Sequence, residues 1–443
     1  MKRESRSIAR AAALTLAVLL AGSAASFAVT DEEVFRDFRF NLSNPGARSV
    51  GLGGAFIAVA DDATASRANP AGLMLLARPE FFTEIRDTKA DSSSIDQTFG
   101  GGQGIASSTD PRATFGPSFI SYVYPWKRFA AGISRLELNS TNNNTSNAFA
   151  LSFDPNNPSN LFVLGGRGSI QSDLSVWNVS GAAKITDKIS VGATVAIGVL
   201  SLRSSVTNTL TDSSDPNSPT FNIPQTLYTT DINSTDTDFA FNAGVHWRPW
   251  SKLSFGAVYR GGMKFKVPET VANDGFFGGG FAASLGSPLS TTFNTPDSWG
   301  AGAAWRPLAA LTVSLDWVHI KYSQLLDGFQ SGLNVLTIFD QQAKFTINDT
   351  DEFHLGGEWV FTAGSVPWAV RGGAYSEHNA RIFADFKNGQ SSFSSNDSFP
   401  PRDVVAHYTV GTCVVVKDRF QIDAAADFSR FANEYVVSTI FRF

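Results

Sequence analysis

The five histidines are the side chains of this 443-residue sequence best suited to acid–base chemistry. Hydrolysis by a serine nucleophile would place one of them beside a nucleophile motif, and none has such a neighbour. They are His246, His319, His354, His378 and His407. No cluster of His, Cys, Asp and Glu has the spacing of a metal site, and the Asp pairs lack an EF-hand pattern. We therefore expect no catalytic residues, no metal and no cofactor.

The N-terminus has the layout of a secretory signal peptide. A basic stretch, an apolar run at residues 11–20 and a stretch of small residues follow one another. The apolar run is too short to cross a bilayer as a helix, which takes about 20 residues. We therefore expect cleavage near Ala25 or Ala28, and we assign residues 1–28 to the signal peptide.

Cysteine content and net charge limit the classes of protein and partner that fit this sequence. The sequence has one cysteine, Cys413, so an exported chain would have no internal disulfide and its stability would come from the fold itself. The net charge is −5 at pH 7, and no block rich in Lys and Arg follows the N-terminus. This argues against nucleic acid as a partner.

Most of the chain alternates apolar and polar residues with the period of two that is typical of β-strands. In residues 189–202, Ile189 and Val191 begin an apolar face, while Ser190 and Thr194 belong to a small or polar face. One face suits lipid and the other suits a packed or wet lumen, so a mean hydropathy of −0.05 fits a membrane barrel. The 37 Phe, 9 Trp and 38 Gly fit aromatic girdles and tightly packed strands.

The alternating segments are joined in turn by short turns and by long loops rich in Ser, Asn, Asp and Gly. We count about 14 strands, an even number that returns both ends of the wall to the periplasm and places the long loops outside the cell. The predicted fold is therefore all-β, an antiparallel transmembrane barrel of about 14 strands over residues 79–443.

The last strand ends on an aromatic residue. Tyr435, Val437 and Phe441 share a face with the terminal Phe443. Such an end resembles the signal by which the outer-membrane assembly machinery recognises its clients, so we expect that machinery as a partner. An ordinary edge strand that ends in Phe is the alternative.

Residues 29–78 do not alternate and are expected to lie apart from the wall. They contain a Gly-rich stretch at residues 44–62 that ends in Ala-Asp-Asp, followed by Asn-Pro-Ala at residues 69–71. Together these motifs resemble the N-terminal plug of the FadL/TodX family, outer-membrane transporters of long-chain fatty acids and aromatic hydrocarbons. The resemblance extends into the predicted barrel at residues 295–317 and 353–373.

The resemblance implies that residues 29–78 form a plug, or hatch, that fills the barrel from the periplasmic side. Residues that it assigns to the plug turn and to pairing with inward basic groups are Asn69, Pro70, Ala71, Asp61 and Asp62. Pro70 fixes φ and Asn69 can turn or cap the chain, which suits a compact plug. The alternative is a simple turn, with the two carboxylates solvated or capping a short helix.

The same resemblance implies capture of hydrophobic cargo among the outer loops, binding inside the barrel and sideways release into the membrane. A protein path is needed because a tail in water stays hydrated at about 0.8 kcal/mol per methylene. Two long loops are unexpectedly apolar and supply candidates for capture, Phe276, Phe277, Phe281, Leu285, Phe329 and Phe339. Phe38 and Phe40 of the plug are candidates for an inner pocket. Packing of these loops on each other or on lipid headgroups is the alternative.

Two further predictions concern the wall. Alternation breaks in residues 129–138, and a bulge near Ser134 would restore it and could mark the site of lateral exit, although many bulges have no such role. Arg260, Lys264 and Arg371 are expected on the inner face, where they could bind a carboxylated head group. Ordinary ion pairs within the lumen are the alternative for these three cations.

The sequence thus predicts uptake of hydrophobic compounds across a Gram-negative outer membrane, with membrane lipid and a small hydrophobic cargo as partners. A similar barrel could instead serve a protein secretion system as a cargo shuttle. A general porin is disfavoured because residues 29–78 should plug the lumen. An outer-membrane phospholipase is a further alternative, which a lipase assay of the purified protein would test.

Overall fold

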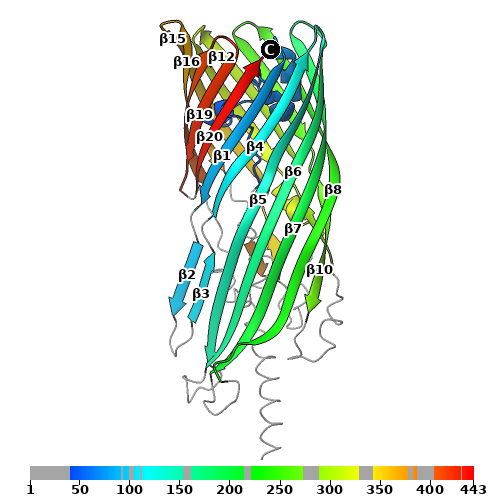
Figure 1. The fold of residues 1–443 in the computed structure, drawn as a ribbon, viewed down its shortest axis with the longest axis vertical. Coiled ribbons are helices and arrows are strands. Elements are labelled where there is room, and N and C mark those ends of the chain that lie inside the picture. The colour runs from blue at the N-terminus through cyan, green and yellow to red at the C-terminus, as the bar shows by residue number, and fades with distance from the viewer. Residues whose placement is uncertain are drawn as a thin grey trace, which may run out of the picture.

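The computed structural model describes residues 40–90, 93–98, 104–109, 112–152, 161–213, 221–272, 289–328, 343–377, 383–386, 404–430 and 432–443. Within them, fourteen strands form one closed antiparallel barrel (Figure 1). In order around the wall these are β1 (Glu80–Ala90), β4 (Arg112–Pro125), β5 (Phe129–Ser152), β6 (Leu161–Lys184), β7 (Ile189–Ser213), β8 (Gln225–Trp250), β9 (Leu253–Arg260), β12 (Ser298–Leu308), β13 (Leu311–Ile320), β15 (Thr350–Ala363), β16 (Val366–Glu377), β18 (Val405–Val416), β19 (Phe420–Phe428) and β20 (Ala432–Arg442). β20 pairs back onto β1 along its whole length, which closes the ring and confirms the predicted fold.

The two ends of the barrel differ. Short turns and the C-terminus lie at the upper end in Figure 1, which is the periplasmic end by the loop-length rule. At the other end β5, β6, β7 and β8 continue as a tall curved sheet, with 24, 24, 25 and 26 residues. A membrane crossing takes about 9–11 residues of tilted strand. These four strands therefore extend well beyond the membrane on the extracellular side.

Several smaller elements lie at the extracellular end of the barrel. β2 (Ser93–Thr98) and β3 (Gly104–Thr109) form a hairpin that pairs with β5. β10 (Lys264–Ala272) pairs with β8 and with β11 (Leu289–Asn294). β14 (Ala343–Thr346) and β17 (Phe383–Phe386) make a separate two-stranded sheet, and η4 (Tyr322–Leu326) is a short 3-10 helix. Among the described residues, no helix is long and apolar enough to cross a membrane.

The outer face of the wall follows the predicted alternation. On β7, Val195 and Val199 are exposed to the surroundings while Ser190 and Thr194 are buried in the lumen. Trp residues cluster in the periplasmic half of this face, where an interfacial aromatic girdle is expected. Those more than half exposed are Trp126, Trp250 and Trp305.

The predicted inward position of Lys264 is wrong. β9 ends at Arg260, which is buried, and β10 begins at Lys264 after a three-residue interruption. Lys264 is exposed and its neighbour Phe265 is fully buried. Side chains alternate between the two faces only while the strand is continuous. The break at residues 261–263 shifts this alternation by one residue, so the inward positions of β10 are the odd-numbered residues. A strict period of two carried through Gly261 and Gly262 therefore assigned Lys264 to the wrong side.

Residues 40–78, called the plug below, lie inside the barrel. They contain α3 (Ala47–Gly51), α4 (Ala65–Ala68) and η2 (Pro70–Leu75), joined by tight turns. These helices are too short to be stable alone, so they must be stabilised by packing against the surrounding wall. Phe56, Leu52 and Leu73 are among the largest fully buried side chains of the protein.

Candidate functional site

The Asn-Pro-Ala turn of the plug packs directly against the wall. Asn69 is fully buried, and its Nδ2 donates to the carbonyl oxygens of Ile57 at 3.0 Å and Val245 at 3.1 Å. Its Oδ1 accepts a hydrogen bond from the backbone N–H of Ala71 at 3.2 Å. The side chain thus closes its own turn and also joins two plug segments to β8.

Glycines in the wall make room for this turn. Gly192 of β7 and Gly244 of β8 are direct neighbours across the sheet. A Cβ atom at Gly192 would overlap Pro70, and one at Gly244 would overlap Asn69. The wall is therefore flat at Gly192 and Gly244, and the turn packs directly on these two residues. We call this pair of glycines the seat. The sequence reading assigned no role to these glycines.

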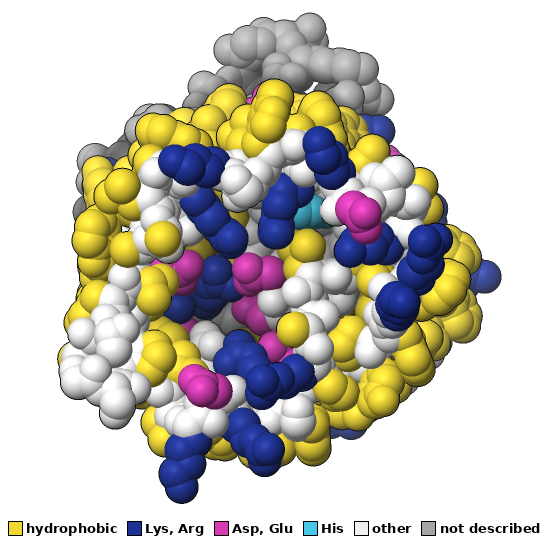
Figure 2. Space-filling model, turned by 90° about the horizontal axis from the view of Figure 1, so that it is seen from above, with side chains coloured by type: hydrophobic (Ala, Val, Ile, Leu, Met, Phe, Trp, Pro, Cys, Tyr) yellow, Lys and Arg dark blue, Asp and Glu magenta, His cyan; other side chains and the backbone are white. Residues whose placement is uncertain are grey.

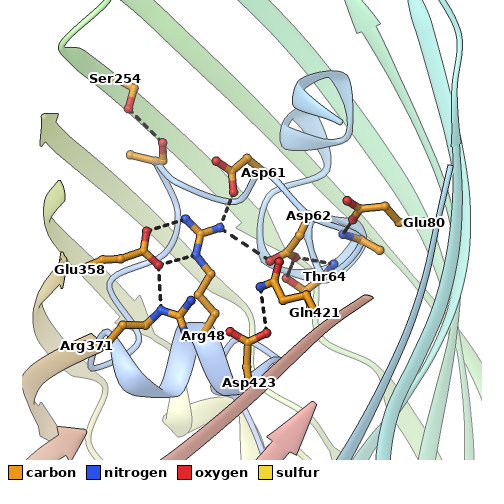
Figure 3. A network of polar contacts seen from close by, with 12 residues as sticks. Arg48, Asp61, Asp62, Thr64, Glu80, Ser254, Glu358, Arg371, Gln421 and Asp423 are labelled. Carbon is orange, nitrogen blue, oxygen red and sulfur yellow. Dashed lines mark hydrogen bonds and ion pairs between the residues drawn. The ribbon is translucent and has the colours of Figure 1, made fainter. Parts of the chain in front are cut away.

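A buried ion network holds the other side of the plug (Figure 3). Arg48 of α3 binds Glu358 of β15 with two hydrogen bonds of 2.9 and 3.0 Å and also pairs with Asp61. Arg371 of β16 donates to Glu358 at 2.7 Å and to Asp423 of β19 at 2.7 Å. The predicted inward cation Arg371 is thus enclosed by carboxylates at the plug and lies away from the extracellular side.

The two adjacent aspartates of the plug have different roles. Asp61 pairs with Arg48 and lies 3.5 Å from Arg306 of the barrel, so it has a basic partner on the wall. Asp62 is buried and accepts from the backbone N–H of Thr64 at 2.9 Å. Burial raises the pKa of Asp62, and Arg48 at 3.8 Å offsets part of that rise.

Carboxylates of the wall also bind the plug backbone. Asp316 of β13 accepts hydrogen bonds from Phe56 N at 2.6 Å and Ile57 N at 2.7 Å through one oxygen. Glu80 of β1 accepts from Ala63 N at 3.0 Å. Charge-assisted bonds of this kind are stronger than neutral ones. The sequence reading missed both residues because nothing local in the sequence links a strand carboxylate to a distant turn.

Arg260 of β9 also binds the plug. Its guanidinium donates to Asn44 Oδ1 at 2.7 Å, to the Ala68 carbonyl oxygen at 2.8 Å and to the Arg67 carbonyl oxygen at 3.3 Å. Burial and the nearby Arg260 guanidinium lower the pKa of Arg67. Arg260, like Arg371, is therefore engaged by the protein itself.

A cavity of about 240 Å³ lies on the extracellular side of the plug. Phe40 lines it, in the place expected for an inner-pocket residue, and its ring lies 5.8 Å from that of Phe293. The apolar side chains along the cavity are Phe40, Leu42, Val318, Ile320, Tyr322 and Leu325. The cavity thus offers an apolar surface inside the barrel.

Another part of the cavity lining is polar. The rings of His354, Tyr375 and His407 stack across β15, β16 and β18, with centroids 5.0 and 4.2 Å apart. Tyr375 O–H donates to Asp427 at 2.6 Å. His407 has Asp427 on one ring nitrogen at 3.0 Å and Glu377 on the other at 2.9 Å. In the described part of the chain, no group of three His, Cys, Asp or Glu residues could hold a metal ion.

The cavity reaches a gap in the wall between β4 and β5. These strands pair from Pro125 with Ala130 as far as Phe119 with Leu136. Beyond that point β4 stays paired with β1, and β5 stays paired with β6. Cavity-lining residues on the two sides of the gap are Thr114, Gly116 and Ser118 on β4 and Glu137, Leu138 and Asn139 on β5.

A bulge lies at this gap. The β5–β6 register shifts between Glu137 and Asn139, so that Leu138 and Asn139 are both buried. The bulge is therefore a few residues beyond Ser134, where the sequence placed it. Ser134 instead accepts a hydrogen bond from Ser66 of the plug at 3.1 Å. The shift was hard to locate because Arg135 and Glu137 remain on the outer face up to the bulge.

Seven of the predicted site residues are not among the residues that the structure describes. Those outside the described residues are Phe38, Phe276, Phe277, Phe281, Leu285, Phe329 and Phe339. Their roles in capture and in the pocket stay predictions.

The periplasmic face carries Lys and Arg around its rim and acidic groups in a central hollow (Figure 2). A second cavity of about 160 Å³ lies on this side and is lined by Arg48, Asp61, Asp62 and Arg442 among others. The two cavities share no lining residue, because different parts of the plug line each of them. The plug thus separates the extracellular cavity from the periplasm.

Residues 40–436 match the family described as outer membrane protein transport protein (OMPP1/FadL/TodX). The chain belongs to this family. It is therefore an outer-membrane transport protein, as its sequence predicted. Comparison with curated proteins gave no match.

Three solved structures share the fold of this family member. A Pseudomonas aeruginosa FadL homologue has a TM-score of 0.61 and 16% identity, covering 89% of this chain and 98% of its own. The Pseudomonas putida toluene transporter TodX has a TM-score of 0.56 and 15% identity, covering 91% and 99%. The Ralstonia pickettii toluene transporter TbuX has a TM-score of 0.53 and 16% identity, covering 91% and 99%.

Proposed function

We propose that this protein takes up small hydrophobic compounds, which bind in the extracellular cavity and leave sideways between β4 and β5. The observation that supports lateral exit is the contact between the cavity and the unpaired stretch of these two strands. A closed ladder would block such a route, because every backbone group of the wall would be paired. Passage straight through would require removal of the plug, which the wall holds at many points.

The outer surface beside the gap suits a cargo that enters lipid. Phe115 on β4 is 78% exposed and Ile133 on β5 is 50% exposed, so apolar side chains border the exit. Cargo that leaves here would pass from one apolar surface to another without full hydration. This avoids the cost of exposing its carbons to water, about 25 cal/mol per Å².

The size of the cavity favours small cargo. An engineered apolar cavity of about 150 Å³ binds benzene, so 240 Å³ has room for one substituted ring or a short chain. Two of the similar structures are toluene transporters. We therefore favour single-ring aromatic compounds over long-chain fatty acids, with the apolar loop residues named above as the capture surface.

Gly116 provides the test of lateral exit. A Cβ atom there would meet nothing within 4 Å, so Gly116→Trp can place a large ring at the gap without a clash. We expect this variant to lose most of its uptake in cells that depend on the protein, because the ring would fill the cavity mouth at the gap. The matched control is Gly181→Trp on β6, where the added group also meets nothing within 4 Å.

Uptake that Gly116→Trp leaves intact would exclude the gap as the exit. Loss of uptake in both variants would point to a general defect in assembly. The secretion-shuttle alternative has no support from the family match, which describes transport across the outer membrane.

A further inference from the structure

The extracellular cavity carries many carboxylates for a site that takes apolar cargo. Its lining carries the inward carboxylates Glu352, Glu377, Asp427 and Glu434, whereas Glu137 lies on the outer face at the gap and pairs with Arg135 at 3.6 Å. The cationic groups along it are the guanidinium groups of Arg86 and Arg260, together with the imidazoles of His354 and His407. Inward carboxylates therefore outnumber guanidinium groups by four to two.

Both guanidinium groups are already engaged. Arg86 lies 2.9 Å from Glu84 and 2.9 Å from Glu434, so two carboxylates share its charge. Arg260 donates to oxygens of Asn44 and to the backbone of the plug at 2.7 to 3.3 Å. A carboxylate that entered the cavity would have to displace these partners before it could form an ion pair.

The imidazoles do not reverse this balance. His407 lies between Asp427 and Glu377, and carboxylates only accept hydrogen bonds, so both of its nitrogens donate when it is cationic. Even with both imidazoles cationic, two imidazolium and two guanidinium groups only equal the four inward carboxylates, and each of these cations already has a protein partner. His354 Nδ1 lies 2.8 Å from the Gly53 carbonyl oxygen and therefore donates to it. The other nitrogen of His354 lies 3.4 Å from Glu352.

We infer that the cavity selects apolar cargo whose polar end is a hydrogen-bond donor, a hydroxyl or an ammonium group, and disfavours carboxylates. The inference rests on the proposed function and names its cargo class. The apolar body would lie against Leu42, Val318 and Ile320, and the donor would reach Glu352, which is the cross-strand neighbour of Val318, or Glu377. A carboxylate would meet like charges that it cannot hydrogen-bond, which is a common device for rejecting a ligand.

This reverses the expectation that inward cations bind a carboxylated head group. Arg260, Lys264 and Arg371 were the candidates, and of these Arg260 lines the cavity but is held by the plug, whereas Lys264 and Arg371 do not line it. Arg260 donates to the plug, Arg371 binds Glu358 beside Arg48 of the plug, and Lys264 is exposed. The chemical groups left to face cargo are mainly acceptors.

The test compares four ligands with the same ring and one attached carbon: toluene, benzyl alcohol, benzylamine and benzoate. Binding to the full-length protein in nanodiscs would be measured by calorimetry at neutral pH. We expect benzyl alcohol and benzylamine to bind at least about tenfold more tightly than benzoate, since one ion pair or hydrogen bond to a charged group is worth about that factor. Equal or tighter binding of benzoate would overturn the inference.

The same series separates this inference from the proposed function. Binding of toluene and benzoate alike would contradict donor selection but leave hydrophobic uptake standing. If none of the four ligands bound, the proposed function would fail together with the inference.

Removal of one negative charge should weaken the selection. We expect Glu377→Gln to reduce the preference for benzylamine over benzoate by about tenfold, because the side chain keeps its shape and loses its charge. Glu352→Gln is the second variant, in case the first disturbs the stack of rings. Asp187→Asn is the control, since this carboxylate is fully exposed in the turn before β7 and should leave the preference unchanged. An unaltered preference in both cavity variants would show that these carboxylates do not select cargo.

Discussion

Asn69 of the plug donates from its side-chain nitrogen to the backbone carbonyl oxygen of Val245 on β8, 3.1 Å away. The approach is close because Gly244, the adjacent residue, has no side chain to separate turn and wall. The plug is thus positioned by close packing of the Asn69 side chain on the wall backbone as well as by charge. Gly244, a wall residue without a side chain, therefore helps to determine the position of the plug.

Gly244→Ala should destabilise the protein. The new methyl group would overlap Asn69, so the turn must shift or the wall must bend. Forcing extra volume into a packed interior costs about 1–3 kcal/mol. We expect a lower free energy of unfolding in urea, followed by tryptophan fluorescence in detergent, and faster hydrogen exchange of the plug amides.

The control for this substitution is Gly181→Ala. Gly181 lies on β6, and a methyl group there would meet nothing within 4 Å. Its unfolding free energy should stay close to that of the wild type. If both alanine variants lost the same stability, strand flexibility rather than the seat would explain the effect.

Arg48→Met should loosen the plug. The substitution keeps an unbranched side chain but leaves Glu358 and Asp61 without the guanidinium that binds both. Arg371 remains beside Glu358 and Arg306 beside Asp61, so we expect a cost below that of a buried charge left without any partner, which is about 3–5 kcal/mol. We expect reduced stability and a measurable ion conductance in planar bilayers, where the wild type should conduct little.

Lys188→Met serves as the comparison for charge removal at the periplasmic end. Lys188 is exposed in the turn between β6 and β7, outside the network of Arg48. It should leave both stability and conductance unchanged. A conductance that rose equally in the two variants would mean that surface charge, and not the plug, limits ion flow.

The barrel could be predicted from the sequence because every strand shows the same alternation of apolar and polar residues. Lipid on one side and lumen on the other impose the same period of two, and the alternation in β7 is visible in its letters alone. The plug turn was found by its resemblance to a family motif. The structure then showed what Asn69 contacts, which the motif could not supply.

The partners of the plug could not be predicted, since they are distant in the chain. Arg48 and Glu358 are 310 positions apart, and Asp316 and Phe56 are 260 apart. Nothing in either local sequence selects the other. The errors at Lys264 and Ser134 have a related origin, because an interruption or a bulge shifts the alternation by one residue and leaves little trace in composition.

The mature protein should begin after the predicted signal peptide. Cleavage at Ala25 or Ala28 would give a chain starting at Ser26 or Val29. Intact mass spectrometry of protein purified from outer membranes would distinguish these two products. A full-length mass would contradict cleavage, and would mean that residues 1–28 remain attached to the plug.

Phe443 should matter more for assembly than for stability. Its ring is 57% exposed and packs edge-on against Tyr122 with centroids 6.1 Å apart, while its backbone N–H donates to the Pro79 carbonyl oxygen at 3.1 Å. Truncation of a half-exposed ring removes little buried surface, so Phe443→Ala should unfold at nearly the wild-type urea concentration once purified.

The same variant should reach the outer membrane several-fold less efficiently, if the terminal aromatic is read by the assembly machinery. Phe428→Ala is the matched control, because Phe428 is a 42% exposed aromatic at the opposite end of the neighbouring strand. Quantitative blotting of outer-membrane fractions would compare the two. Equal yields would show that Phe443 is an ordinary strand end, whereas a selective loss for Phe443→Ala, with unfolding unchanged, would assign it to recognition.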